Sequence, residues 1–139
     1  MAMDCLAAVE RQLRSPMQKP KGLPLLGTAM NPDQTLPELQ LQRAALKDLL
    51  PNTPERPRQI AHLQHSFGLR AQSMLAKSTE AEREPLSSVI PICRAEIRHF
   101  IRDEHATSAS DVLSRRCRLA MVDSAEADRL RPLVEKELK

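Results

Sequence analysis

The chain has 139 residues, 41% of them hydrophobic and 28% charged, and a formal net charge of +3. This composition is typical of one globular domain with a modest core, and it excludes an intrinsically disordered chain. The net charge is too slight to require a nucleic-acid partner, and aromatic side chains that could stack on bases are limited to two Phe, with no Tyr or Trp. We therefore expect no nucleic acid among the partners.

The cysteines and the apolar runs bear on disulfide bonding and on membrane association. Cys5, Cys93 and Cys117 are odd in number and far apart, which argues against a disulfide framework and fits a reducing compartment. No run approaches the roughly 18 apolar residues needed to span a bilayer, and no apolar region of a signal peptide is visible. We expect a soluble fragment.

The first predicted elements are a short helix and an irregular connection. Asp4 is a candidate N-cap for a helix over residues 5–14, which Pro16 would end. Its apolar side would carry Leu6, Val9 and Leu13. Residues 15–32 hold four of the eleven prolines and two of the three glycines, so an irregular segment is predicted there.

Helices are predicted again from residue 35. Thr35 and Glu38 form a capping-box pattern that opens a helix to about Leu50. Thr53 is the predicted N-cap of the next helical segment, which Gly68 would divide into two helices. These helices would cover residues 55–67 and 69–77, with a core-facing stripe of Ile60, Leu63, Phe67, Ala71 and Met74.

Two amphipathic helices joined by a short turn are predicted in RAEIRHFIRDEHATSASDVLSRRCRLA, residues 94–120. At 100° per residue the first would bury Cys93, Ile97, Phe100 and Ile101, and the second Ala109, Val112, Leu113 and Ala120. Thr107 or Ser108 is the candidate N-cap of the second helix. A last helix, capped by Ser124 and ending near Leu138, would turn Ala127, Leu130 and Val134 inward. Small aliphatic side chains at helical spacing favour an all-α fold, a compact bundle of about six helices.

One arginine falls on an apolar face of this helix pair. Arg116 projects onto the same side as the buried residues of the second helix, where an unpaired guanidinium would be very costly. Glu96 and Glu104 border the apolar face of the first helix. We therefore predict that Glu96 or Glu104 pairs with Arg116.

The neighbouring arginines raise a second possibility, an anion-binding site. We favour one interior ion pair at Arg116, with Arg115 and Arg118 at the surface or at a domain interface. Asp111 and Arg115, four residues apart, would form a surface pair worth about 0.3–0.5 kcal/mol. The candidate ion-pair or interface residues are thus Glu96, Glu104, Asp111, Arg115, Arg116 and Arg118.

The histidines and cysteines are not predicted to carry chemistry. His62 and His65 have a spacing that can hold a metal, but both project opposite the core-facing stripe, so a solvated face is favoured and no metal site is predicted. Cys93 and Cys117 lie on apolar faces and are interpreted as core thiols. His99 projects away from Cys93, so no catalytic residue is predicted.

The segment over residues 94–120 resembles the C-terminal helical domain of FAD-dependent glycerol-3-phosphate dehydrogenases. The family pattern runs A-E-V-R-Y, then E-Y-A-x-T-A-x-D-V-L-x-R-R-T-R-L-A. It matches Ala95, Glu96, Arg98, Glu104, Ala106, Ala109, Asp111, Val112, Leu113, Arg115, Arg116, Arg118, Leu119 and Ala120. The sequence HLQHSFGLRA is similar to the family's H-L-x-x-x-Y-G-x-R-A, with Phe67 in place of Tyr. Further departures are Cys117 for the usual Thr, His105 and Ile90-Pro91 where Tyr is common, and a more polar stretch over residues 123–129.

The resemblance implies a role inside a larger enzyme. The family oxidises sn-glycerol 3-phosphate to dihydroxyacetone phosphate, passing a hydride to FAD and then electrons to membrane quinone. Its FAD contacts and catalytic groups lie in an N-terminal part, on which the helical domain packs as a cap. We accordingly expect residues 1–32 to connect from a flavin-binding domain, with Gly22–Gly27 as a crossing strand or loop, and residues 33–139 to form the cap. Eukaryotic members are associated with the mitochondrial inner membrane.

The resemblance also sets expectations for this chain by itself. A dinucleotide site needs glycines spaced as G-x-G-x-x-G after a strand, and Gly22, Gly27 and Gly68 do not have that spacing. We therefore expect the 139 residues alone to bind no FAD and to be inactive. The alternative is a free-standing helical protein-interaction module.

Overall fold

The computed structural model describes residues 2–14 and 25–139. Within these ranges the secondary structure is helical, apart from an isolated bridge between Pro85 and Cys93. The α-helices are α1 (Ala2–Leu13), α2 (Thr35–Leu49), α3 (Arg56–Phe67), α4 (Ala71–Leu75), α5 (Glu80–Arg83), α6 (Arg94–Arg102), α7 (Leu119–Val122) and α8 (Ser124–Glu137). The predicted compact all-α fold is confirmed. Among the described helices, none combines the length and the hydrophobicity of a membrane-spanning segment.

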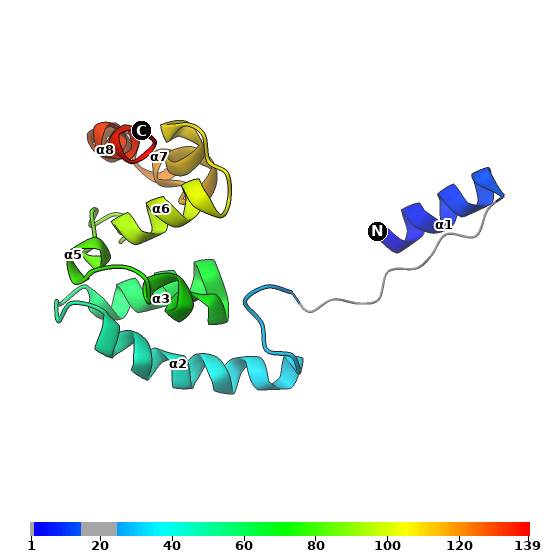
Figure 1. The fold of residues 1–139 in the computed structure, drawn as a ribbon, viewed down its shortest axis with the longest axis horizontal. Coiled ribbons are helices and arrows are strands. Elements are labelled where there is room, and N and C mark those ends of the chain that lie inside the picture. The colour runs from blue at the N-terminus through cyan, green and yellow to red at the C-terminus, as the bar shows by residue number, and fades with distance from the viewer. Residues whose placement is uncertain (1, 15–24) are drawn as a thin grey trace.

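The helices from α2 to α8 stack around α6, which lies between two hydrophobic clusters (Figure 1). One cluster joins α2, α3 and α4 to Cys93 and Ala95 at the start of α6. The other joins Ile97 and Phe100 of α6 to the residues that follow, through α8. Because α6 contributes to both clusters, it couples the two halves of the body.

Most of the predicted apolar stripes are buried. Ile60, Leu63 and Ala71 of the predicted stripe are at most 1% exposed, while Phe67 and Met74 are partly buried. Leu46 and Leu50, at the end of α2, are buried in the same cluster. The inward-facing residues of α8 are buried as well, namely Ala127, Leu130 and Val134. These helices therefore fold where their apolar periodicity predicts.

Some of the predicted helix starts are wrong. Helix α1 already begins at Ala2, so Asp4 lies in its first turn and not at its cap. Ahead of α2, Asn31 caps a 3₁₀ turn, Pro32–Gln34. That turn leads directly into α2, so Thr35 does not form the predicted capping box, and its hydroxyl instead accepts from the Ala29 N–H at 3.3 Å. The predicted crossing segment up to residue 24 lies outside the described residues.

The starts of α3 and α8 also differ from the prediction. Thr53 makes no side-chain cap, because residues 54 and 55 form a turn and α3 begins at Arg56. Asp123, not Ser124, caps α8, its carboxylate accepting from the Glu126 N–H at 2.9 Å. Asp is as good an N-cap as Ser, so which of the two neighbours caps the helix depends on where the preceding chain enters.

The second helix of the predicted pair is irregular. Asp111–Arg116 form a π-helical segment, η3, which ends at Cys117. Arg118 then adopts a left-handed conformation with φ 59°, and the separate short helix α7 begins at Leu119. Ala120 therefore belongs to α7 and not to the predicted helix. The turn at Arg118 sends the chain back towards α8.

Two glycines pack backbone against backbone. Gly27 and Gly68 have φ of 89° and 56°, and the Leu69 N–H donates to the Gly27 carbonyl at 2.9 Å. A Cβ on Gly27 would lie 2.7 Å from the Phe67 carbonyl oxygen, and one on Gly68 would collide with the Gly27 carbonyl oxygen. Glycine at both positions thus lets residues 25–30 contact the end of α3.

We predict that Gly68→Ala lowers the free energy of unfolding by about 2 kcal/mol or more, because it combines a positive φ with a backbone collision. Urea unfolding followed by circular dichroism measures this. Gln40→Ala at an exposed position of α2 is the control, expected to change stability by less than about 0.5 kcal/mol. Equal stability of the two variants would contradict the prediction.

Candidate functional site

An open groove of about 760 Å³ brings most of the predicted residues together. We call it the arginine groove, and its ionisable lining residues are Arg58, His62, His65, Glu104, Arg115, Arg116, Cys117 and Arg118. Its apolar lining includes Phe67, Ile90 and Val122. Four guanidinium groups and two imidazoles thus face a single carboxylate, so the groove favours an acidic or anionic partner.

Arg116 contacts Glu104 rather than Glu96. Its Nε lies 3.1 Å from Glu104 Oε2, and its Nη2 donates to the Glu104 backbone carbonyl at 2.8 Å. The two side chains are 29% and 38% exposed, so this pair lies at the rim of the groove and not in the interior. Pairs in such positions are screened by water and contribute little to stability.

Asp111 organises the start of η3. Its Oδ2 accepts from the N–H groups of Thr107 and Ser108, while the Ser108 hydroxyl accepts from the Asp111 N–H at 3.1 Å. Of the two candidate N-caps, Ser108 is therefore the one that caps the helical turn over residues 109 and 110, which leads into η3. Asp111 also pairs with Arg115 four residues on. The pKa of Asp111 is well below its usual value, because of the Ser108 hydroxyl, the Thr107 N–H and Arg115.

Arg118 differs from Arg115 and Arg116. It is exposed, it follows the end of η3 in a left-handed conformation, and it lines the arginine groove. Within the described part of the chain its guanidinium has no carboxylate partner. Of the three candidate arginines in the groove, Arg118 is therefore the one available to another molecule or domain.

The prediction that His62 faces solvent is wrong. His62 Nε2 lies 2.7 Å from Glu96 Oε1, and the Glu96 side chain is fully buried. The Cys93 N–H donates to the other Glu96 oxygen at 2.9 Å. His62 is partly buried and contacts α6 through Glu96, whereas His65 is exposed. The signal that was missed is Glu96 at the third position of α6, from which a carboxylate reaches back to the helix start.

The two buried thiols are unsuited to nucleophilic chemistry. Burial raises the pKa of the Cys93 thiol well above its usual value, and the Glu96 carboxylate raises it further. Burial also raises the pKa of Cys117. Since a thiolate is the reactive form, the interpretation of both residues as core thiols agrees with the structure. In the described ranges, no three His, Cys, Asp or Glu residues are grouped as metal ligands would be.

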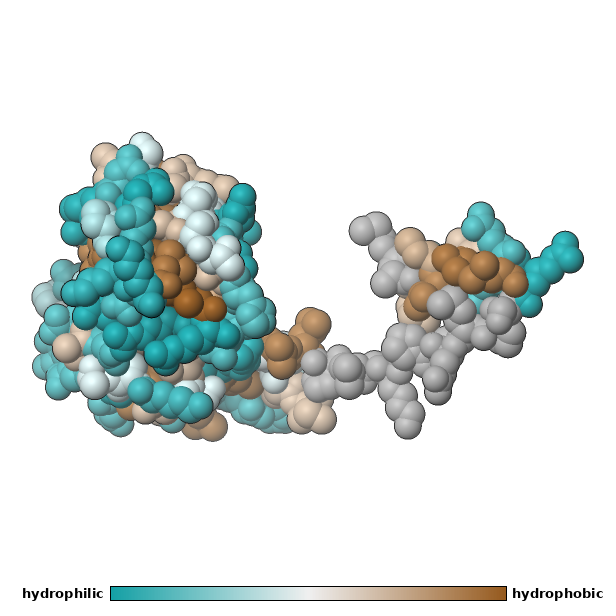
Figure 2. Space-filling model, turned by 45° about the horizontal axis from the view of Figure 1, so that its top comes forward, coloured by the Kyte–Doolittle hydropathy of each residue, from teal (hydrophilic) through white to brown (hydrophobic). Residues whose placement is uncertain are grey.

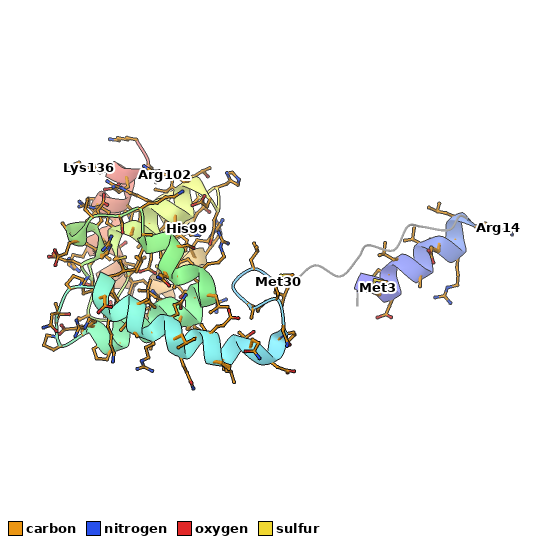
Figure 3. All side chains as sticks on the ribbon, turned by 60° about the horizontal axis from the view of Figure 1, so that its bottom comes forward. Met3, Arg14, Met30, His99, Arg102 and Lys136 are labelled. Carbon is orange, nitrogen blue, oxygen red and sulfur yellow. The ribbon has the colours of Figure 1, made fainter. Side chains whose placement is uncertain are left out.

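His99 was considered in the sequence only as a partner for Cys93, yet it links several of these groups. It lies inside the body (Figure 3) and is only 8% exposed. Its Nδ1 is 2.8 Å from Asp103 and its Nε2 3.6 Å from Glu104, while its ring meets Phe67 edge-on with centroids 5.3 Å apart. Because Glu104 also holds Arg116, His99 connects the interior to the rim of the arginine groove.

We predict that Glu96→Ala lowers the free energy of unfolding by about 3 kcal/mol, because it leaves the His62 ring and the Cys93 N–H without their buried partner. The double variant, Glu96→Ala with His62→Ala, should lower the free energy of unfolding by less than the sum of the two single variants. Chemical unfolding of the four proteins measures both values. His65→Ala, at an exposed position of the same helix, is the control, and a Glu96→Ala variant as stable as this control would refute the pair.

We also predict that only Cys5 reacts rapidly with a thiol reagent near neutral pH, since Cys93 and Cys117 are buried and their pKa values are raised. Counting reacted thiols with and without denaturant measures this. Rapid labelling of Cys93 in the folded protein would contradict the buried environment described above.

Comparison with known proteins agrees with the resemblance found in the sequence. A family model described as the C-terminal domain of alpha-glycerophosphate oxidase matches residues 20–139. Neither the curated proteins nor the solved structures contain a match to this chain. The matched residues include α2 to α8 and every residue of the arginine groove. Because the match covers well over half of its length, the chain belongs to the family of C-terminal domains of alpha-glycerophosphate oxidase, an FAD-dependent type of oxidoreductase.

Proposed function

We propose that this chain is the C-terminal cap of an FAD-dependent glycerol-3-phosphate dehydrogenase. The enzyme would oxidise sn-glycerol 3-phosphate to dihydroxyacetone phosphate and pass the electrons to quinone. The observation that carries the proposal is the family match over residues 20–139, which includes the complete segment 94–120. In this proposal residues 1–32 connect to a flavin-binding domain and residues 33–139 form the cap.

FAD and the hydride transfer are assigned to the preceding domain. Binding of the pyrophosphate requires a glycine-rich turn between a strand and a helix, and the three glycines of this chain lack that spacing. Two of them, Gly27 and Gly68, are engaged in the backbone contact between residues 25–30 and α3. The cap would therefore support the flavin domain without contributing a catalytic residue.

The arginine groove is the face we propose for docking of the flavin domain. It combines an unpaired cation, Arg118, with the apolar side chains of Phe67, Ile90 and Val122. Val122 is 66% exposed and its neighbour Met121 73%, so two adjacent large apolar side chains are accessible to a partner at this face. Carboxylates of the flavin domain would complement the guanidinium groups.

A second exposed apolar region lies where the described chain resumes. Leu25, Leu26 and Met30 are 77%, 83% and 85% exposed. Hydrophobic side chains are visible at this end of the body (Figure 2). These residues fall in the proposed connection, so the flavin domain would also cover them. By analogy with the eukaryotic members of the family, we place the whole enzyme at the mitochondrial inner membrane, where quinone is its acceptor.

The experiment expresses this chain as one protein together with the sequence encoded upstream of it in the source genome. We expect the joined protein to show visible flavin absorbance and to reduce a quinone analogue when sn-glycerol 3-phosphate is added. The 139 residues alone should do neither. Hydrogen peroxide formed in place of reduced quinone would contradict the dehydrogenase assignment. The absence of any flavin-binding sequence upstream would overturn the proposal in favour of a free-standing interaction module.

The docking face is tested in the same joined protein. Arg118→Glu should lower activity about tenfold or more, because it places a like charge against the proposed carboxylates. Arg43→Glu on the exposed side of α2 is the matched control and should leave activity within about twofold. Unchanged unfolding midpoints of both variants in the isolated chain would separate a docking defect from a folding defect. Equal activity of the two variants would refute this face.

A further inference from the structure

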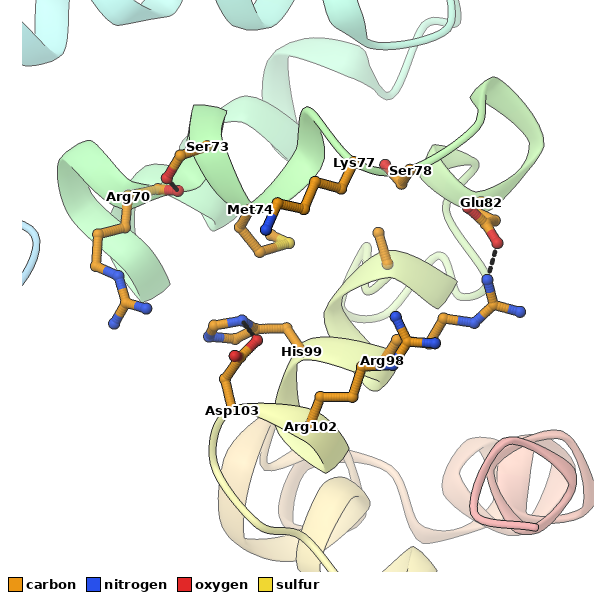
Figure 4. A pocket seen from close by; sticks show the side chains of 11 residues that line it. Arg70, Ser73, Met74, Lys77, Ser78, Glu82, Arg98, His99, Arg102 and Asp103 are labelled. Atoms are coloured by element: carbon orange, nitrogen blue, oxygen red, sulfur yellow. Dashed lines mark hydrogen bonds and ion pairs between the residues drawn. The ribbon is translucent and has the colours of Figure 1, made fainter.

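A second cavity, of about 310 Å³, lies between α4 and α6. We call it the α4–α6 cavity. Four cationic side chains line it, and they come from three parts of the chain: Arg70 from the 3₁₀ turn before α4, Lys77 from the turn after α4, and Arg98 and Arg102 from α6. Figure 4 shows Lys77 and Arg102 reaching into the gap from its two sides, with Arg70 at one end. Arg70, Lys77 and Arg102 are exposed, so water screens their mutual repulsion, and an anion bound among them would gain favourable charge interactions.

The two carboxylates of the cavity are already engaged. Glu82 pairs with Arg98, which is also held by Glu137 at 2.7 Å. Asp103 pairs with His99 at 2.8 Å. No carboxylate of the described residues pairs with Arg70, Lys77 or Arg102. Three guanidinium or ammonium groups around one cavity thus remain available to a ligand.

Favourable interaction with helix C-termini explains the positions of only some of these cations. Arg102 is the last residue of α6 and Lys77 follows α4, and cations are favoured near helix C-termini. Arg70, however, immediately precedes α4, where the helix dipole disfavours a positive charge. The hydroxyl groups of Ser73 and Ser78 donate to backbone carbonyls of their own turns, so the three cations are the donors that remain.

We propose that the α4–α6 cavity binds a phosphate group. Arginine holds phosphate through paired N–H groups and lysine adds a compact charge, so Arg70, Lys77 and Arg102 together suit a doubly charged oxyanion better than a single carboxylate. The ligand is a small phosphate monoester or the headgroup of a phospholipid. Met74 and Ala95 provide apolar lining beside the charged groups. This proposal stands apart from the docking of the flavin domain, because none of these residues lines the arginine groove.

The test titrates the full 139-residue chain with inorganic phosphate by calorimetry. A parallel arm measures binding to phosphatidylcholine vesicles with and without phosphatidic acid. Arg102→Gln and Lys77→Gln should each weaken binding about tenfold, the loss of one charge-assisted contact. Lys47→Gln on α2, at an exposed position outside the cavity, should change the affinity less than about twofold.

The two arms identify the source of the phosphate. Binding of free phosphate that both cavity variants weaken supports a small soluble ligand, and binding only to the acidic vesicles, weakened in the same way, supports a lipid headgroup. No binding in either arm overturns the proposal. Equal weakening by Lys47→Gln overturns it as well, because binding would then reflect net charge alone. Unfolding curves of the variants are expected to coincide with that of the unaltered chain.

Discussion

The fold depends on one buried carboxylate. Glu96 is completely enclosed, and burying an unpaired carboxylate would cost several kcal/mol. It receives the Cys93 N–H from its own helix and contacts the His62 ring on α3, so both oxygens have partners. Since α6 contributes to both hydrophobic clusters, this contact fixes how α3 and α6 align where the two halves of the body meet.

The charged groups that connect to the surface through the end of α6 are more exposed than Glu96. His99 is buried but contacts Asp103 and Glu104, which are 60% and 38% exposed, and Glu104 in turn holds Arg116. His99 lines the α4–α6 cavity and Glu104 lines the arginine groove. The two cationic surfaces are therefore connected by a short series of contacts through the end of α6, although they present different side chains to their partners.

These features suit a domain that supports another one. The chain belongs to a family of C-terminal domains, and its most distinctive charges lie on accessible surfaces and not in an enclosed catalytic pocket. Two of the three thiols, Cys93 and Cys117, are buried and have raised pKa values. Docking and anion binding, which need accessible arginines and exposed apolar side chains, are the chemistry that this arrangement favours.

The sequence by itself determined the fold class, the inward faces of the long helices and the family. Apolar residues at helical spacing predict the buried sides of α3 and α8, because burial of such a stripe is what stabilises a helix in a small domain. The arginine-rich segment over residues 94–120 was sufficient to identify the family, because its side chains recur at defined positions.

Only the tertiary structure decided which charged groups meet. Periodicity identifies the apolar face of a helix, but it does not show which polar side chains of another helix lie beside the remaining faces. His62, predicted to lie opposite the apolar stripe, therefore contacts Glu96 of α6. With Glu96 engaged by His62 and Cys93, it is Glu104, in the turn after α6, that contacts Arg116. The π-helical turns of η3 and the left-handed Arg118 likewise depend on how the chain returns to α8. Contacts between helices depend on their relative position and rotation, which the pattern within a single helix does not specify.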